Sequence, residues 1–282
     1  MTATEAIAEP GTPGPSDASP PRFRRPSMPA VLIALVVLSL VGHGLLSTGL
    51  QLERLLLAPE RTFDFLSRAF PPATDRVPNL GAAMLETLEM AVIGTLLGAA
   101  LSLPVALLAA RNTSPHRLVS LAATSALTTM RAIPDLVWAL VFVVSVGLGP
   151  LAGILTITID VLAFAGRFFA ERIEEVDSGP VDALKSTGAG RVAVIACAVV
   201  PTCFPSFTGT TLYALEKSVR GAVVLGLVGA GGIGVELNVA FQLRRFDTAL
   251  TIILLILVVV ILVERLSSTI RQRALAGYRQ PG

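Results

Sequence analysis

The feature that most constrains the fold is a series of apolar runs, each long enough to cross a lipid bilayer as a helix. A membrane-spanning helix needs about 20 predominantly apolar residues. Only 15% of the 282 residues are charged, against about 25% in soluble globular proteins. We therefore predict an all-α, polytopic membrane protein with about six transmembrane helices, at about 30–50, 81–110, 118–146, 151–168, 192–215 and 246–263.

Composition divides the chain into four segments. Residues 1–28 are rich in Pro, Ser, Thr, Ala and Gly without apolar periodicity, so we expect a disordered cytoplasmic tail. Residues 29–78 combine the first apolar run, interpreted as a retained membrane anchor, with a proline-containing periplasmic segment. The main transmembrane domain is expected over 79–273, and 274–282 form a cytoplasmic C-terminal tail.

The basic residues favour one orientation in the membrane. If the N-terminus lies inside, 13 of the 22 Lys and Arg residues fall on the cytoplasmic side and eight on the outer side, with Arg131 in the membrane. Cytoplasmic loops carry an excess of Lys and Arg, so we predict that both termini are cytoplasmic. The net charge of +2 gives no reason to expect a nucleic-acid partner.

The polar loop at about 171–201 carries a spaced pattern. Asp182, Ala183 and Leu184 are followed by three residues and Gly188, then by nine residues and Ala198, and one residue later by Val200 and Pro201. This spacing resembles the cytoplasmic motif of bacterial ABC importer permeases, which has Glu-Ala-Ala, three residues, Gly, nine residues, Ile, one residue and Leu-Pro. Four positions differ, and each replacement keeps its charge sign or its apolar character.

The motif predicts a mechanical role. Glycine permits a bend between two short helices at Gly188, and the small Ala183 lets the first helix enter a groove of an ATPase. We expect Asp182 to cap that helix, because acidic side chains suit helix N-termini. The resemblance makes Asp182, Ala183, Leu184, Gly188 and Pro201 the ATPase-coupling residues.

A more specific resemblance covers about residues 79–273. Residues 131–135 (RAIPD), 171–177 (ERIEEVD), 212–220 (LYALEKSVR) and 224–234 (VLGLVGAGGIG) are similar to the phosphonate-type ABC importer permeases. The resemblance implies the type I importer permease fold in a bacterial inner membrane, with translocation rather than catalysis as the activity. It also implies a second permease copy or paralogue, an ATPase dimer that holds ATP and Mg, and an extracytoplasmic binding protein that delivers phosphonate, phosphite or phosphate. No cofactor is expected in this chain.

Charges inside membrane spans are functional candidates by default, because they are costly to bury. Arg131 lies about midway along the third run, and Asp135, one turn later, or Asp160 in the fourth run are its expected partners. The glycine-rich segment 221–235 is too short to cross alone, so we expect a re-entrant or broken helix. The candidate pathway residues are Arg131, Pro134, Asp135, Asp160, Glu216 and Arg220, the last two at the outer end of the fifth run, with Gly226, Gly229, Gly231, Gly232 and Gly234.

Other apparent motifs lack the context that they need. The segment 229–234 fits G-x-G-x-x-G, but no alternating strand and helix pattern surrounds it. The segment 179–186 has Leu184 at the second glycine position of a P-loop, so backbone amides there cannot cradle a phosphate. Cys197 and Cys203 lie in an apolar run, and we interpret them as small buried residues.

Three alternatives remain open at this point. An ABC permease for another solute, such as an amino acid, would carry the same coupling motif. An ion-driven secondary transporter would be expected to show inverted repeats and paired broken helices. A membrane scaffold without transport activity would not need the coupling spacing.

Overall fold

The computed structural model describes residues 27–47 and 56–276, and all regular elements in these ranges are helices. The predicted tail at 1–28 therefore lies almost wholly outside the described residues, as does the chain after residue 276. The chain forms two compact units, residues 1–62 and 63–282. The first unit contains helix α1 (Met28–Ser47), which has 20 residues and no buried side chain. Its predominantly apolar surface is typical of a helix solvated by lipid.

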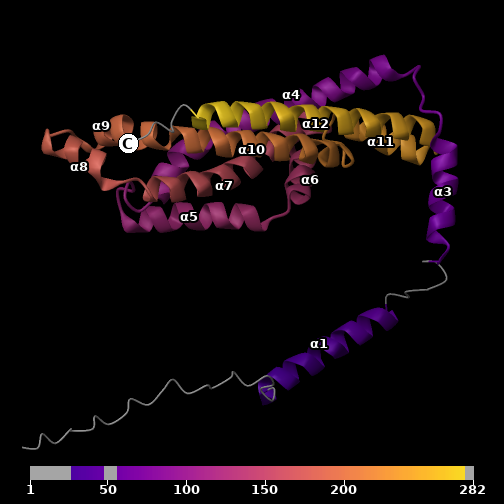
Figure 1. Cartoon of the computed structure of the whole chain (residues 1–282), viewed down its shortest axis with the longest axis horizontal. Helices are drawn as coiled ribbons and strands as arrows, with labels where there is room; N and C mark the ends of the chain where they lie inside the picture. The colour runs from indigo at the N-terminus through magenta and orange to yellow at the C-terminus, as the bar shows by residue number, and fades with distance from the viewer. Residues whose placement is uncertain (1–26, 48–55, 277–282) are drawn as a thin grey trace, which may run out of the picture. The chain divides into compact units, whose positions relative to one another are not determined.

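The second unit is a bundle in which α4, α7, α10 and α12 run alongside one another (Figure 1). The short helices α8 and α9 lie at one end of this bundle, with the C-terminal end of α12, while α11 lies toward the other end. Helix α3 (Ala58–Ala69) precedes the bundle and crosses the boundary between the two units. The bundle consists of α4 (Val77–Ala109), α5 (Arg117–Ala132), α6 (Asp135–Val146), α7 (Pro150–Glu174), α8 (Ser178–Ser186), α9 (Arg191–Val194), the π-helix η1 (Ile195–Val199), α10 (Val200–Gly226), α11 (Ile233–Gln242) and α12 (Phe246–Ala276).

The prediction of about six membrane spans is confirmed in number. Five helices of the described ranges are long and apolar enough to cross a bilayer, and the pair α5 and α6 makes a sixth if it is one bent span. The fifth run is longer than predicted, because helical structure continues without a break from Arg191 to Gly226. Glu216 and Arg220, expected at the outer end of this run, therefore lie within the helix, before its last residue Gly226.

The third predicted span is not a straight helix. Helices α5 and α6 meet at about 90° across Ile133 and Pro134. Proline disfavours helical geometry in the residue before it, and Ile133 is accordingly extended at φ −87° and ψ 123°. The carbonyl of Met130 at this break accepts hydrogen bonds from the Ile133 N–H and from Trp138 Nε1, each at 3.4 Å. The bend thus remains partly hydrogen-bonded within the protein, as membrane depth requires.

Small residues bring α4 and α7 into close contact. A Cβ atom on Gly94 would lie 2.7 Å from Cβ of Ile157, and one on Gly98 would lie 2.6 Å from Cβ of Val161. One turn further, the Ser102 hydroxyl is buried and lies 3.3 Å from the carbonyl of Leu162. Gly94 and Gly98 therefore allow the two helices to pack closely, because the α7 side chains occupy the space that larger residues would fill.

We predict that Gly98→Ala destabilises the protein, whereas Gly81→Ala on the same helix does not. The new methyl group at Gly98 would also lie 2.8 Å from the Thr158 carbonyl, while nothing lies within 4 Å at Gly81. Overpacking of this kind costs about 1–3 kcal/mol, and alanine in an open helix position gains up to about 1 kcal/mol. Chemical unfolding in mixed micelles measures both, and equal stability of the two variants would contradict the close packing.

Candidate functional site

The helix that carries the predicted coupling motif is exposed and packs lightly on the bundle. Helix α8 has no buried residue. Val181 and Leu184 are half-buried on its inner side, with Val181 against the apolar core, while Asp182 and Ala183 are exposed. The side that carries Ala183 is thus available to a partner protein.

The predicted bend at Gly188 is present. Gly188 has φ +82°, a conformation that side-chain-bearing residues rarely adopt, and the Gly188 N–H donates to the Lys185 carbonyl at 3.0 Å. After this bend the chain enters α9, η1 and α10. Pro201 stands near the start of α10, directly after the π-helix η1. Because proline lacks a backbone N–H, a widened turn just before it is one way to avoid a clash with the preceding turn.

The predicted capping role of Asp182 is wrong. Helix α8 begins at Ser178, four residues before Asp182, and its N-cap is Asp177, whose Oδ1 accepts from the Gly179 N–H at 3.2 Å. Asp182 instead lies in the middle of the helix, and its carboxylate pairs with Lys185 Nζ at 3.2 Å. Both side chains of this pair are mostly exposed, so the pair adds little stability.

An ion cluster forms where α6, α7 and α10 meet. Lys217 Nζ lies 2.7 Å and 2.9 Å from the two carboxylate oxygens of Asp160, and 4.0 Å from Asp135 Oδ2. It also lies 5.6 Å from the centroid of the Phe164 ring, within the range of a cation–π contact. Asp160 is the least exposed member, at 17% of its side-chain surface. Lys217 thus forms a close ion pair with Asp160 and a longer one with Asp135.

The expected pairing of Arg131 with Asp135 or Asp160 is wrong. Arg131 lies exposed in the last turn of α5, while Asp135 opens α6 beyond the 90° bend, so Pro134 separates the two residues in space. The Arg131 side chain makes no ion pair within the described residues. Asp160 pairs with Lys217 instead of Arg131.

A cavity of about 320 Å³ adjoins the ion cluster. Asp135, Asp160, Lys217 and Arg220 line it together with apolar and small side chains of α6, α7 and α10. Arg220 is exposed, and its side chain has no acidic partner in the described part of the chain. Three of the predicted pathway residues therefore meet here, while Arg131 does not line this cavity.

Glu216 lies on the same helix but points into the bundle. It is 8% exposed, and its Oε1 has no hydrogen-bond partner in the described structure. The neighbouring Ser218 hydroxyl is also buried without a partner. The buried face of α10 therefore carries polar side-chain atoms that have no hydrogen-bond partner in the described chain, and leaving such atoms unpaired is costly in an apolar medium.

The glycine-rich segment is a tight reversal between α10 and α11. Gly226 and Gly234 face each other so closely that a Cβ atom on Gly226 would lie 2.7 Å from Cα of Gly234. Gly229, Gly231 and Gly232 have φ between +73° and +91°, the region where glycine carries no steric penalty. The expectation of a broken helix is confirmed, but none of the five glycines lines the charged cavity.

Two side chains of α4 cap the helix that follows this reversal. Glu86 Oε1 accepts from the Gly232 N–H at 3.0 Å, and the Thr87 hydroxyl accepts from the Ile233 N–H at 2.8 Å. They satisfy backbone donors that the first turn of α11 leaves unpaired. The sequence offered only a weak signal for this role, since Glu86 and Thr87 stand near the start of an apolar run and 146 residues before the groups they bind.

Comparison with known proteins places these features in a family context. The family described as binding-protein-dependent transport system inner membrane component matches residues 102–275. The transport system permease protein HtxC of Stutzerimonas stutzeri is 36% identical over 247 residues, covering 88% of this chain and 88% of that relative. The phosphite transport system permease protein PtxC of the same species is 38% identical over 204 residues, covering 72% and 74%. The phosphate-import permease protein PhnE of Mycolicibacterium smegmatis is 42% identical over 207 residues, which cover 73% of this chain and 39% of that relative.

Solved structures support the fold. A chain of the inward-facing MetNI methionine ABC transporter matches with a TM-score of 0.64 and 20% identity, covering 72% of this chain and 99% of that chain. A chain of an amino acid ABC transporter matches with a TM-score of 0.59 and 18% identity, covering 70% and 94%. At this level of identity the likeness shows a shared fold, which is the predicted type I importer permease fold.

We predict that Thr87→Val destabilises the protein and that Thr95→Val on the same helix does not. Thr87 bonds to the α11 backbone, so its loss leaves the Ile233 N–H buried without a partner, at a cost of about 1–3 kcal/mol. The Thr95 hydroxyl is buried but has no partner, so replacing it with a methyl group should be neutral or stabilising. Unfolding in mixed micelles tests the pair, and equal losses would argue against the cap.

Proposed function

The chain belongs to the family of binding-protein-dependent transport system inner membrane components, and on that premise we propose that it is the permease subunit of an ATP-binding-cassette importer for phosphonate, phosphite or phosphate. As a permease it is a multi-pass membrane protein that conducts a solute and catalyses no reaction. ATP and Mg belong to the partner ATPase.

The observation that carries the mechanism is the continuity between the coupling bend and the ion cluster. Helix α8 exposes Ala183 to a partner, and the chain bends at Gly188. The following helix, Arg191–Gly226, runs unbroken to Lys217 and Arg220. A displacement of α8 by the ATPase dimer is therefore passed along this helix to the charged cavity, which suits alternating access.

The partners follow from this role. An ATPase dimer docks on α8, a second permease copy or a paralogue completes the transmembrane pore, and an extracytoplasmic binding protein delivers the cargo. Both termini lie in the cytoplasm in this proposal. Arg271, near the end of α12, lines a cavity with Arg172 and Glu175, which precede α8, so the C-terminal end of α12 lies on the ATPase side.

The cargo proposal rests on the relatives and on the charged cavity. The relatives named for phosphite and phosphate are 38% and 42% identical to this chain, whereas a probable D-methionine permease of Vibrio cholerae is 27% identical. Arg220 offers a planar fork that can bind two oxygens of an oxyanion. An oxyanion in the cavity would also compete with Asp160 for Lys217, and such competition keeps binding weak enough for release. Arg131 stays a proposed second contact on the pathway.

Coupling is tested by Gly188→Val with Gly190→Val as its control. Neither glycine has an atom within 4 Å of an added Cβ, but Gly188 has φ +82° and Gly190 has φ −68°. Only the first substitution strains the bend, by 1–2 kcal/mol or more, so we expect transport coupled to ATP hydrolysis to fall about tenfold or more with membrane insertion unchanged. Proteoliposomes containing the ATPase and the binding protein provide the assay, and a Gly188→Val variant that transports normally would refute the coupling role.

The pathway is tested by Arg220→Gln, with Arg245→Gln as the control. Arg245 is exposed in the turn before α12 and does not line the cavity. Loss of a charge-assisted contact of about 1.5–3 kcal/mol should reduce uptake of radiolabelled phosphate or phosphite about tenfold or more, while Arg245→Gln stays near wild type. Arg131→Ala is measured beside them, and wild-type uptake by a well-assembled Arg131→Ala variant would remove Arg131 from the pathway.

A further inference from the structure

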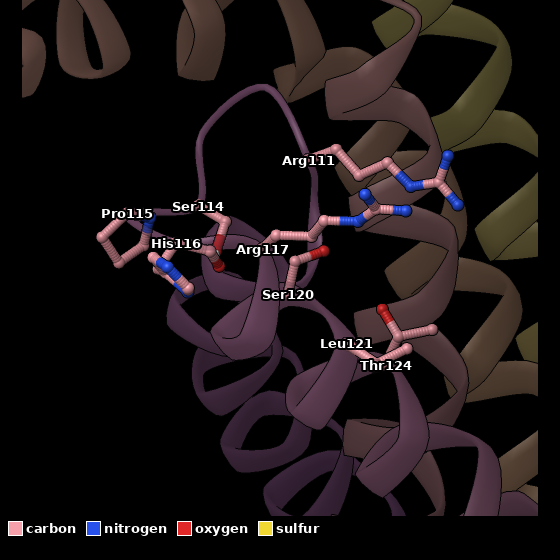
Figure 2. A pocket seen from close by; sticks show the side chains of 8 residues that line it. All are labelled: Arg111, Ser114, Pro115, His116, Arg117, Ser120, Leu121 and Thr124. Carbon is pink, nitrogen blue, oxygen red and sulfur yellow. The ribbon is translucent and has the colours of Figure 1, made fainter.

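A second charged cavity lies at the connection between α4 and α5 (Figure 2). It has a volume of about 520 Å³ and is lined by Arg111, Arg117, Ser120, Leu121 and Thr124, among others. It is distinct from the cavity beside Lys217, with which it shares no lining residue. The proposed transport role makes no use of it.

The cavity adjoins the end of the bundle that carries α8. The Arg111 N–H donates to Glu174 Oε1 at 2.8 Å, where α7 ends. Arg191, the first residue of α9, donates to the carbonyl of Thr113 at 2.7 Å. The α4–α5 connection is thereby fastened to both sides of the coupling loop.

Two positive charges in the cavity are not neutralised by the described chain. The side chains of Arg111 and Arg117 extend in the same direction, whereas His116 and Pro115 point away from them (Figure 2). Neither guanidinium has an ion-pair partner in the described residues, and no acidic residue lines the cavity. Glu174 lines a different cavity, beside α8. Like charges that converge without a counter-ion favour the binding of an anion with several oxygens.

The loop that presents these arginines is held by its own hydrogen bonds. The Ser120 hydroxyl donates to the Ala109 carbonyl at 2.6 Å, and the Thr113 hydroxyl donates to the Leu107 carbonyl at 2.8 Å. Both side chains are buried. The backbone of the loop is therefore positioned without help from either arginine side chain, which leaves the guanidinium groups free for a ligand.

An exposed apolar surface adjoins the arginines. Leu121, which lines the cavity beside the Thr124 hydroxyl, is 63% exposed, and Leu118 on the same helix, outside the cavity lining, is 68% exposed. Helix α5 begins at Arg117, Arg111 lies in the connection before it, and Leu118 and Leu121 follow within the first turns of the helix. Such an order, with charge at the interface and apolar surface below, matches a phospholipid better than a free ion.

We propose that this cavity binds the phosphate headgroup of an anionic phospholipid, with Arg111 and Arg117 on the phosphate and an acyl chain along Leu118 and Leu121. Free inorganic phosphate shares the headgroup chemistry but gains nothing from the leucines. The site requires only that the chain is embedded in a membrane, so it stands or falls independently of the cargo and of the ATPase.

Native mass spectrometry of the purified full-length protein tests the site with phosphatidylglycerol and phosphatidylcholine. We expect the wild type to retain phosphatidylglycerol in preference to phosphatidylcholine. The double variant Arg111→Gln with Arg117→Gln should bind phosphatidylglycerol roughly 30-fold more weakly, since each basic residue near a membrane surface contributes roughly fivefold in binding. The matched control is Arg265→Gln with Arg273→Gln, two exposed arginines of α12 that line no part of this cavity.

Three outcomes would overturn the proposal. The first is an equal preference for both lipids in the wild type. The second is an equal loss in the control and the test variants, which would indicate a general effect of surface charge. The third is displacement of phosphatidylglycerol by inorganic phosphate at millimolar concentration, with the same dependence on the two arginines, which would assign the cavity to the free ion. Thermal unfolding in phosphatidylcholine checks that the variants are folded, and the single variant Arg117→Gln, with about a fivefold loss expected, provides a second test.

Discussion

Hydrocarbon offers no hydrogen-bond partners, so each backbone N–H and C=O that leaves a helix inside a bilayer must find its partner within the protein. This chain meets the requirement at two interruptions. At the bend between α5 and α6, the Met130 carbonyl accepts from Ile133 and from the Trp138 indole. At the reversal between α10 and α11, Glu86 and Thr87 receive the N–H groups of Gly232 and Ile233. Hydrogen bonds within the protein thus hold both helix breaks in a defined geometry.

One long helix connects the coupling bend with the ion cluster. The helix from Arg191 to Gly226 begins just after the coupling bend and ends at the glycine reversal. It contains the π-helical turn, Pro201 and Pro205, where distortion of a helix is expected to concentrate. It also bears Lys217, which binds Asp160 of α7. Movement at the exposed helix α8 can therefore change the geometry of the ion cluster without a separate relay.

Small residues set how closely the other helices approach. Gly94 and Gly98 let α4 lie against Ile157 and Val161 of α7, and helix association in membranes depends on this kind of close packing rather than on water exclusion. The cavity at the ion cluster is lined by Asp160 and Ile157 of the same helix α7. Packing of α4 on α7 thus positions one wall of the proposed pathway.

Local properties of the sequence determined much of this protein. The apolar runs predicted the all-α membrane fold, and Gly188 predicted the coupling bend, because helix length and glycine geometry depend on neighbouring residues alone. Their charge within or at the end of apolar runs also identified Asp135, Asp160 and Arg220 as candidates, but did not identify their partners. Lys217 and Asp160 are 57 residues apart, and Glu86 and Gly232 are 146 apart, so only helix packing could bring them together. The expected partnership of Arg131 failed because the chain bends by about 90° beside Pro134, and the proline predicts a break in the helix but not its angle. Sequence determined which segments cross the membrane, and the tertiary structure decided which charges meet there.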